Sequence, residues 1–430
     1  MSHMTASRKS SPFSGTYRKS VLKNGLRIVT ESFPAVRSVS LGVWIDVGSR
    51  NENPAENGLS HFIEHMLFKG TRRRDARELA AALESLGGGL NGFTSREQTC
   101  YYARCLDEHL PVAVDVLADL ACHSRLAAAH MEREKQVVNE EIKEALDTPS
   151  DRIHDLFAHA YWGNHPLGQP IMGTMENINR VTRPQTIAFM KRHYRSGSIV
   201  IAACGAISHE QVVRLVKKSF EFDQGNSELP LVARRSKERE IMLESDDNKQ
   251  AHFCIGFPAP RYDAPEKMTT LALSSYLGGG MSSVLFQKIR EDLGLAYSVY
   301  TFNDFYRDSG VFGVYLGTDG KRIRQACELV LHELRKLKKQ KLSTLQLHKL
   351  KSQMKGHLVL SQESTNSRMN RLARQELMTG QYQPLEKLLK EIDAVTASAM
   401  SRMAERVFDE SKAAVTVLGA VPKGVFDGVI

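Results

Sequence analysis

The residues of this chain best suited to catalysis lie in one short stretch, GLSHFIEHMLFKG, at positions 58–70. It places His61, Glu64 and His65 in a run that is otherwise as apolar as a core helix. In a helix that turns by about 100° per residue, all three side chains share one face. Histidines at positions i and i+4 can bind one metal ion together, and a carboxylate on that face can act as general base on a metal-bound water. The spacing predicts a catalytic metal centre; core histidines held by ordinary hydrogen bonds are the alternative.

A catalytic zinc site needs a third protein ligand, and the helical stretch 130–147, HMEREKQVVNEEIKEALD, offers candidates. Its apolar stripe consists of Val137, Val138, Ile142 and Ala145. Glu134 and Glu141 fall within this stripe, whereas Glu140 points about 100° away. Carboxylates on a face that points toward the core need a cation or strong donors, and a metal ion supplies both. We therefore expect Glu141 to be the third ligand.

Hydrophobic patterns indicate the elements that must position these residues. The segment 22–49 alternates like a hairpin with a turn at Asn24-Gly25. The second run of that hairpin passes through Val39, Leu41, Val43 and Ile45. Helical patterns then cover 58–69 and 75–86, a strand-like segment covers 90–106, and longer helical stretches cover 109–146 and 150–161.

The second half of the chain repeats this order. A strand at 251–259 precedes a helix at 265–277, paired strands at 296–318 and long helices from 321 to 378. Local phrases also correspond, DTPSDRIHDL at 147–156 with ESTNSRMNRL at 363–372. The repeat, with a period of about 215 residues, suits two homologous α/β domains.

Composition and charge narrow the class of protein. The chain has 430 residues, of which 42% are apolar and 25% charged, as in a soluble globular protein. No run approaches the roughly 18–20 apolar residues of a membrane span, and six scattered cysteines without a CxxC pair indicate reduced thiols, so we expect a cytoplasmic protein. The first residues, MSHM, resemble a cloning remnant, and an organelle transit segment is the alternative for the basic start.

Basic residues concentrate in the stretch 333–357, and the chain carries a formal net charge of +9. Such a stretch can bind nucleic acid or a membrane surface, or it can be a solvated helix face. It lacks the interleaved aromatic residues that a single-strand binder needs. We therefore expect neither a nucleic-acid nor a membrane partner.

The phrase GLSHFIEHMLFKGT, followed 76 residues after His65 by Glu141 in EREKQVVNEEI, resembles the inverzincins. These are the zinc peptidases of the pitrilysin and mitochondrial-processing-peptidase family, peptidase family M16. The resemblance extends from about residue 20 to 420 and is to the short members with one zinc motif. It implies that His61, His65 and Glu141 bind one Zn²⁺ per chain and that Glu64 is the general base. It also implies that Glu134 supports the site.

The resemblance assigns further residues to substrate binding. The strand LNGFTSREQTCYYA corresponds to an edge strand that pairs with the substrate backbone, with Asn91-Gly92 where relatives have Asn-Ala. In FQKIREDLGLAYSVY, Arg290 and Tyr297 match a pair that grips the substrate carbonyl and stabilises the oxyanion. An ordinary turn and strand, and a surface arginine with a core tyrosine, are the respective alternatives.

We therefore expect an α+β protein with two homologous α/β domains, each a largely antiparallel sheet flanked by long helices. The expected divisions are a zinc-binding domain at 15–222, a linker at 223–240 and a second domain at 241–430. The expected function is a zinc endopeptidase that hydrolyses short or unfolded peptides in a chamber enclosed by a homodimer. A non-catalytic scaffold subunit of the same family is the alternative.

Overall fold

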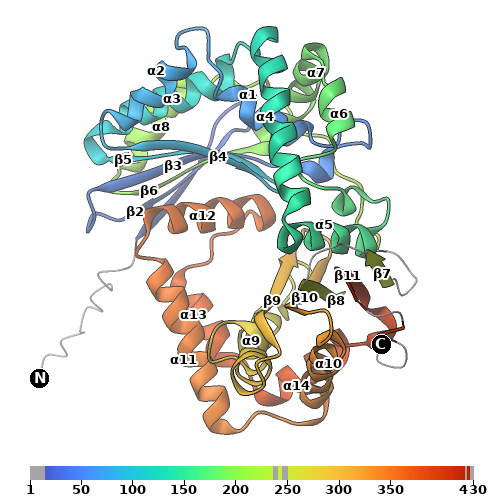
Figure 1. The fold of residues 1–430 in the computed structure, drawn as a ribbon. Coiled ribbons are helices and arrows are strands. Elements are labelled where there is room, and N and C mark those ends of the chain that lie inside the picture. The colour runs from blue at the N-terminus through green and yellow to red at the C-terminus, as the bar shows by residue number, and fades with distance from the viewer. Residues whose placement is uncertain (1–14, 236–240, 245–249, 422–423, 427–430) are drawn as a thin grey trace, which may run out of the picture.

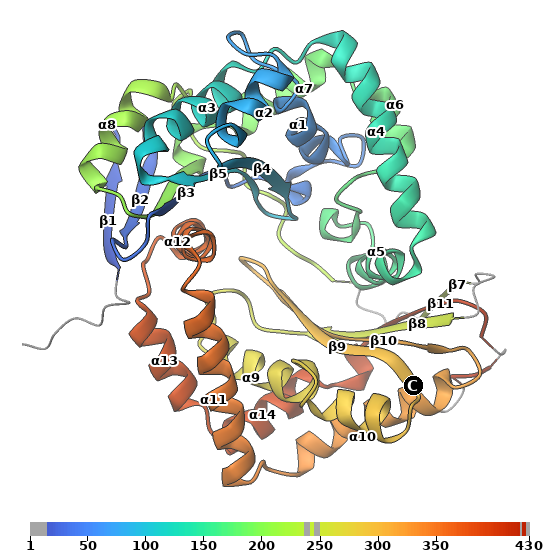
Figure 2. The same ribbon diagram turned by 60° about the vertical axis from the view of Figure 1, so that its left-hand side comes forward.

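The computed structural model describes residues 15–235, 241–244, 250–421 and 424–426 (Figure 1). The expected N-terminal remnant or transit segment lies outside these residues. The chain forms two sheets, each covered by helices on both faces, and the two halves lie one against the other (Figures 1 and 2).

The first sheet has the strand order β1-β2-β6-β3-β5-β4, in which only the β2–β6 pair is parallel. Its strands are β1 (Thr16–Val21), β2 (Arg27–Ser32), β3 (Ser38–Ile45), β4 (Gly89–Thr94), β5 (Thr99–Leu106) and β6 (Ile199–Gly205). The turn at Asn24-Gly25 joins β1 to β2, so the predicted second run of the hairpin is wrong. That run is β3, which pairs with β5 and β6 instead.

The second sheet has the order β7-β11-β8-β10-β9, in which only β7–β11 is parallel. Its strands are β7 (Ile241–Glu244), β8 (Gln250–Pro258), β9 (Ala296–Phe305), β10 (Gly310–Asp319) and β11 (Ala414–Leu418). This order repeats the β2-β6-β3-β5-β4 part of the first sheet, with the same sequence of parallel and antiparallel pairs. The prediction of two related α/β units with largely antiparallel sheets is confirmed.

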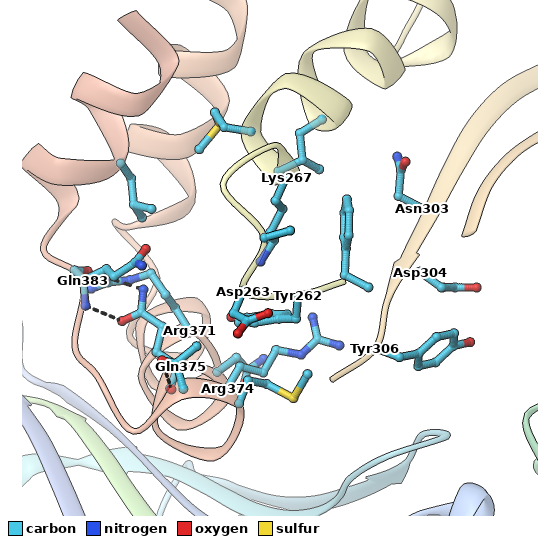
Figure 3. Close-up of a pocket in the computed structure, with 18 of the residues that line it drawn as sticks. Tyr262, Asp263, Lys267, Asn303, Asp304, Tyr306, Arg371, Arg374, Gln375 and Gln383 are labelled. Carbon is cyan, nitrogen blue, oxygen red and sulfur yellow. Dashed lines mark hydrogen bonds between the residues drawn. The ribbon is translucent and has the colours of Figure 1, made fainter. Parts of the chain in front are cut away.

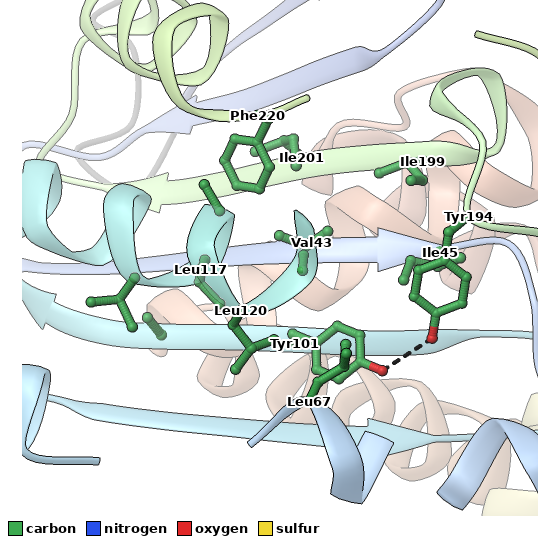
Figure 4. Packing of buried hydrophobic residues seen from close by; sticks show 14 of the residues in the cluster. Val43, Ile45, Leu67, Tyr101, Leu117, Leu120, Tyr194, Ile199, Ile201 and Phe220 are labelled. Carbon is green, nitrogen blue, oxygen red and sulfur yellow. Dashed lines mark hydrogen bonds between the residues drawn. The ribbon is translucent and has the colours of Figure 1, made fainter. Parts of the chain in front are cut away.

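Most helices pack on the outer faces of the two sheets. In the first half they are α1 (Leu59–Leu67), α2 (Ala76–Glu84), α3 (Leu110–His123), α4 (Ala128–Asp147), α6 (Met175–Arg180), α7 (Arg183–His193) and α8 (His209–Ser219). Figure 4 shows part of the resulting core, in which the Tyr101 and Tyr194 hydroxyls lie 3.1 Å apart. The predicted continuous stretch 109–146 is two helices, because the chain turns at Leu126, where φ is +45°.

The second half has its own outer helices and a short π-helical segment. They are α9 (Lys267–Gly278), the π-helix η5 (Phe286–Asp292), α10 (Ile323–Lys339), α11 (Thr344–Ser361), α13 (Leu385–Ala394) and α14 (Ala397–Val407). Short 3₁₀ turns lie at η1 (Ser49–Asn51), η2 (Asp107–His109), η3 (Pro166–Gly168), η4 (Ser196–Ser198) and η6 (Glu410–Lys412).

The inner face of each sheet is covered by a helix from the other half of the chain. Helix α12 (Thr365–Thr379) packs against β2, β3 and β6 of the first sheet, and α5 (Pro149–Trp162) packs against β8 and β11 of the second (Figures 1 and 2). The proposed division at 223–240 therefore separates the two sheets but not the helices that cover them. Residues 236–240 of that linker lie outside the described residues.

A strand glycine makes room for each exchanged helix. A Cβ atom at Gly256 of β8 would lie 2.1 Å from Cζ of Phe157 on α5. A Cβ atom at Gly42 of β3 would lie 3.0 Å from Sδ of Met369 on α12. Both exchanged helices are thus in direct contact with the sheet backbone, as close packing requires.

Buried ion pairs also join the two halves. The Glu31 carboxylate on β2 binds the guanidinium groups of Arg368 and Arg371 on α12 at 2.5 and 2.7 Å. A second group joins Arg50 to Glu97 and Asp308, each at 2.5 Å. Because Glu31 and Arg50 are each 1% exposed, these pairs lie inside the junction rather than on its surface.

Candidate metal centre

Helix α1 presents His61, Glu64 and His65 on a half-buried face. Its other side packs into the core through residues such as Phe62 and Met66, which fixes the rotation of the helix. The Glu52 carboxylate accepts hydrogen bonds from the backbone N–H groups of Gly58 at 2.8 Å and Ser60 at 2.6 Å, and so satisfies donors at the start of α1.

Helix α4 lies beside α1 and carries two inward carboxylates. Its buried residues are Met131, Glu134, Val138 and Ile142. The predicted apolar stripe was wrong at Val137, which is 44% exposed because it lies one position away from this face. Glu134 is 4% exposed, whereas Glu141, two turns later, is half-buried at the rim of an open hollow of about 680 Å³.

The side chains of His61, His65 and Glu141 converge, with one possible ligand atom of each within 4.8 Å of the others. Glu141 Oε2 lies 3.3 Å from His65 Nε2 and 3.9 Å from His61 Nε2. Two ligand atoms bound tetrahedrally to one zinc ion are about 3.3 Å apart. The donor set of two imidazoles and a carboxylate, with these separations, therefore fits a zinc ion.

A carboxylate and a lysine support one of the histidines from behind. His65 Nδ1 donates to Glu134 Oε1 at 2.9 Å, and Lys69 Nζ binds the same oxygen at 2.9 Å. A hydrogen bond of this kind fixes the tautomer that leaves Nε2 free for a metal. His61 lacks such support, because its Nδ1 is buried without a hydrogen-bond partner among the described residues.

The two histidines differ in their tendency to hold a proton. Burial, aided by the charge of His65, lowers the pKa of His61 to about 4, so this imidazole is neutral and has a free lone pair. Burial also lowers the pKa of His65, but the hydrogen bond to Glu134 and the charges of Glu141, Glu134 and Glu64 outweigh it and raise the pKa overall.

Zinc affinity is therefore expected to depend on the release of one proton rather than two. A raised pKa keeps a proton on His65 in the metal-free protein, and zinc must displace it, so the apparent affinity falls about tenfold per pH unit below that pKa. His61 adds no proton competition above about pH 5, given its pKa of about 4. Competition with a chromophoric chelator at a series of pH values measures the change in the logarithm of zinc affinity per pH unit. A slope of two would show that both histidines release a proton and would contradict the prediction of one.

Glu64 faces the same space but is held by a different element. Thr94, the last residue of β4, donates its hydroxyl to Glu64 Oε2 at 2.6 Å. Burial raises the pKa of Glu64, with an opposing effect of the Thr94 hydrogen bond and His65 and a further increase from Glu141. A carboxylate with a raised pKa is suited to take and return a proton near neutral pH.

Among the described strands, β4 lies at the edge of the first sheet and pairs with β5 alone. Asn91 is exposed on it, and its Oδ1 accepts from the N–H of Gly92 at 2.7 Å. A Cβ atom at Gly92 would lie 3.3 Å from Glu64 Cγ and 3.2 Å from the Phe68 ring. The absence of a side chain at position 92 thus leaves the Glu64 side chain uncrowded.

Arg290 and Tyr297 lie in the second half, on η5 and β9. Arg290 stacks over the Phe286 ring at 4.8 Å, and the Tyr297 hydroxyl donates to Gln250 Oε1 at 2.6 Å. Among the residues that the structure describes, no hydrogen bond or ion pair joins either of them to α1 or α4. Interactions within one chain therefore link His61, His65, Glu141, Glu134 and Glu64, and among the described residues they do not include Arg290 or Tyr297.

Three supporting residues, Glu52, Lys69 and Thr94, were missed from the sequence. Lys69 follows His65 by four positions, a spacing that places both on one helix face, so a search for charges near the ligands could have found it. Glu52 and Thr94 act from outside α1, and no periodic pattern connects them to it.

Two family models match the chain. The model of insulinase, peptidase family M16, covers residues 27–175, and that of the peptidase M16 inactive domain covers residues 180–354. The chain belongs to peptidase family M16. The M16 signature of the first half thus coincides with the half that carries the His and Glu cluster.

Curated M16 relatives are similar over nearly their whole length. YmxG of Bacillus subtilis, named an uncharacterized zinc protease, is 41% identical over 391 residues, which cover 91% of this chain and 95% of that protein. A protein of Streptomyces coelicolor with the same description is 38% identical, over 91% of this chain and 87% of its own. These names imply zinc in the relatives.

Two solved structures share this M16 fold. A protease from Helicobacter pylori superposes with a TM-score of 0.88 at 23% identity, over 94% of this chain and 100% of that one. A structure described as a peptidase M16 inactive domain from Pseudomonas fluorescens gives 0.86 at 18% identity, over 94% and 98%. At these identities the comparison shows the fold alone.

The basic stretch 333–357 forms parts of α10 and α11, and several of its cations are used within the protein. Arg335 binds Glu410 at 2.6 Å, and Lys355 binds Asp393. Within the described part of the chain, no helix combines the length and apolar character that crossing a membrane requires.

Proposed function

We propose that this M16 protein is a zinc-dependent endopeptidase that hydrolyses short or unfolded peptides. The observation that carries the proposal is the convergence of His61, His65 and Glu141 beside a carboxylate, Glu64, that is not itself part of the ligand set. A bound zinc ion would supply a Lewis acid and lower the pKa of a water molecule. The edge strand β4 beside it offers free backbone groups to an extended peptide.

Glu64 performs the proton transfers in the proposed reaction. Its carboxylate takes a proton from the attacking water and delivers it to the leaving amine, as general base and then general acid. Thr94 orients the carboxylate through its hydrogen bond. Glu134 and Lys69 keep the His65 ring in place while charge develops.

Chelation tests the proposal. Incubation with a strong chelator is expected to abolish cleavage of an unstructured fluorogenic peptide, and added zinc is expected to restore it. The reason is that no other group in the site can activate the water molecule in place of the metal ion. Cleavage that continues in metal-depleted protein, verified by elemental analysis, would exclude the proposed chemistry. Stable zinc binding without cleavage of any peptide would favour the scaffold alternative.

We further propose that two copies of the chain form the complete site as a homodimer that encloses a chamber. Support comes from the position of Arg290 and Tyr297, which are exposed and make no contact with α1 or α4 among the described residues. In a symmetric dimer the partner can supply both to the zinc-bearing half. They would then stabilise the oxyanion of the tetrahedral intermediate.

Mixing two inactive variants tests this arrangement. Co-expression of Glu64→Gln with Arg290→Met/Tyr297→Phe is expected to recover about a quarter of wild-type activity, because half of randomly formed symmetric dimers contain one intact site of two. Each variant alone serves as control. If mixed dimers form, as tagged copurification would show, yet remain inactive, the two groups do not act across the dimer.

A further inference from the structure

A cavity of about 1280 Å³ lies between the two halves of the chain, apart from the metal centre (Figure 3). Its walls are the β4–β5 turn, the end of β9, the segment that leads into α9, and parts of α11, α12 and α13. It exceeds the roughly 300–1,000 Å³ of typical small-ligand sites, so it has room for a segment of polypeptide.

Three cations that line the cavity, Lys267, Arg374 and the exposed Lys387, have no carboxylate partner among the described residues. Among the described residues, no carboxylate oxygen lies within 4.0 Å of the Lys267 ammonium or the Arg374 guanidinium. Lys267 Nζ instead lies 3.3 Å from the centroid of the Tyr262 ring. In Figure 3 the side chains of Lys267 and Arg374 extend toward Tyr262. Burial, together with the charge of Arg374, lowers the pKa of Lys267 to about 8 and outweighs the opposing charges of Glu391 and Asp263.

The lining acids Glu391 and Asp263 act on Lys267 through space, but among the described residues no acid makes an ion pair with Lys267 or Arg374. Arg371, which lines the same cavity, is already bound to Glu31. Two lining acids are likewise engaged, Asp263 with Arg261 at 2.6 Å and Glu97 with Arg50 at 2.5 Å. The remaining lining acids, beyond ion-pair distance of both cations, are Asp304 and Glu391.

The cavity is continuous with the strand beside the metal centre. Thr94, whose hydroxyl binds Glu64, ends β4, and the next residues, Ser95 and Arg96, already line the cavity. Consecutive Cα atoms are about 3.8 Å apart, so the wall of the cavity begins within one residue of the Glu64 contact. A peptide that pairs with β4 and continues in the direction of Thr94 therefore reaches the cavity.

We propose that Lys267 and Arg374 form a subsite that binds a carboxylate group of the peptide. The carboxylate is either the C-terminus of the bound peptide or one of its acidic side chains, since both present two equivalent oxygens to a guanidinium and an ammonium. The proposal rests on the proposed peptidase function and names a preference for it. Tyr262 and Phe305, whose ring centroids lie 3.3 and 5.4 Å from Lys267 Nζ, form an apolar wall beside the ammonium, whereas Arg374 is exposed to solvent.

Calorimetry with uncleavable complexes tests the subsite. In a zinc-loaded Glu64→Gln background, the probe is a short unstructured peptide of Ala, Ser and Leu with a free C-terminus. It is compared with the same peptide amidated, and with an amidated version that carries glutamates. Lys267→Met or Arg374→Met is expected to weaken the carboxylate peptides about tenfold, the effect of one charged hydrogen bond, without altering the fully amidated one.

Control variants separate the subsite from general effects of charge or folding. Lys390→Met removes an exposed cation of α13 that does not line the cavity and is expected to change nothing. Lys267→Arg keeps the charge and is expected to retain binding. A preference for the free C-terminus over the glutamate peptide identifies the C-terminus as the ligand, and the reverse preference identifies the side chain.

Equal affinity for the amidated and the two carboxylate peptides, or equal losses in Lys390→Met and Lys267→Met, would overturn the subsite. That result is distinct from failure of the proposed function. Wild-type protein that cleaves peptides but binds them without regard to carboxylates refutes the subsite alone. Carboxylate-dependent binding without zinc-dependent cleavage refutes the peptidase alone.

Discussion

Replacement of Glu64 by Gln is expected to lower kcat/KM for peptide hydrolysis by about 10²–10⁴-fold, the usual contribution of a general base. Zinc should remain bound, because Glu64 makes its hydrogen bond to Thr94 and is not part of the His61, His65 and Glu141 cluster. The amide keeps the size of the carboxylate and its contact with Thr94, so the loss reports proton transfer. Steady-state kinetics and elemental analysis of the same preparation measure the two effects.

Glu140→Gln is the matched control for this experiment. Glu140 neighbours Glu141 on α4, but its side chain is 73% exposed and pairs with Lys143. The same chemical change at this position is expected to leave both activity and zinc content unaltered. Full turnover by Glu64→Gln would show that Glu64 takes no part in the mechanism. Loss of zinc from the same variant would show that Glu64 binds the metal or holds one of its ligands in place.

Replacement of Glu31 by Gln is expected to lower the free energy of unfolding by about 3–5 kcal/mol, the usual effect of breaking a buried ion pair from one side. The change removes the carboxylate shared by Arg368, which is 2% exposed, and Arg371. Both cations stay inside the junction between β2 and α12 without that negative charge. Denaturant titration followed by circular dichroism measures the change.

Glu176→Gln provides the comparison on the surface. Glu176 pairs with Arg180 within α6, where the two side chains are 68% and 74% exposed. Solvent screens such a pair, so the unfolding midpoint is expected to stay where it is. A Glu31→Gln protein as stable as Glu176→Gln would show that the buried charges do not hold α12 on the first sheet.

The metal cluster could be anticipated from the sequence because its geometry is local. Three polar residues in the apolar run of α1 have few ways to be satisfied, and helical periodicity fixes the relative direction of their side chains. The two inward glutamates of α4 were found in the same way. Val137 was misplaced because an apolar side chain can be half exposed at little cost, whereas a buried carboxylate such as Glu134 cannot stay unpaired.

Contacts between distant segments could not be anticipated in the same way. Strand β6 lies between β2 and β3, far from both in the sequence, and its apolar pattern does not specify these neighbours. Likewise, the amphipathic patterns of α5 and α12 do not specify which of the two sheets each helix covers. One signal was present: the matching phrases at 147–156 and 363–372 contain the starts of α5 at Pro149 and α12 at Thr365. The similarity identifies α5 and α12 as equivalent helices, but it does not show that each covers the sheet of the other half.

The exchange of α5 and α12 sets an order on how the protein can be made. The inner face of the first sheet is uncovered until α12, which ends at Thr379, has been synthesised. Helix α5 packs against β8 and β11, so its contacts are incomplete until β11 at Ala414–Leu418 has been synthesised. A nascent chain therefore exposes apolar strand surface for almost the whole of its synthesis. A chain that ends before α12 leaves the inner face of the first sheet uncovered, and one that ends before β11 leaves α5 without one of the strands it packs against, so neither half is finished by its own segment alone.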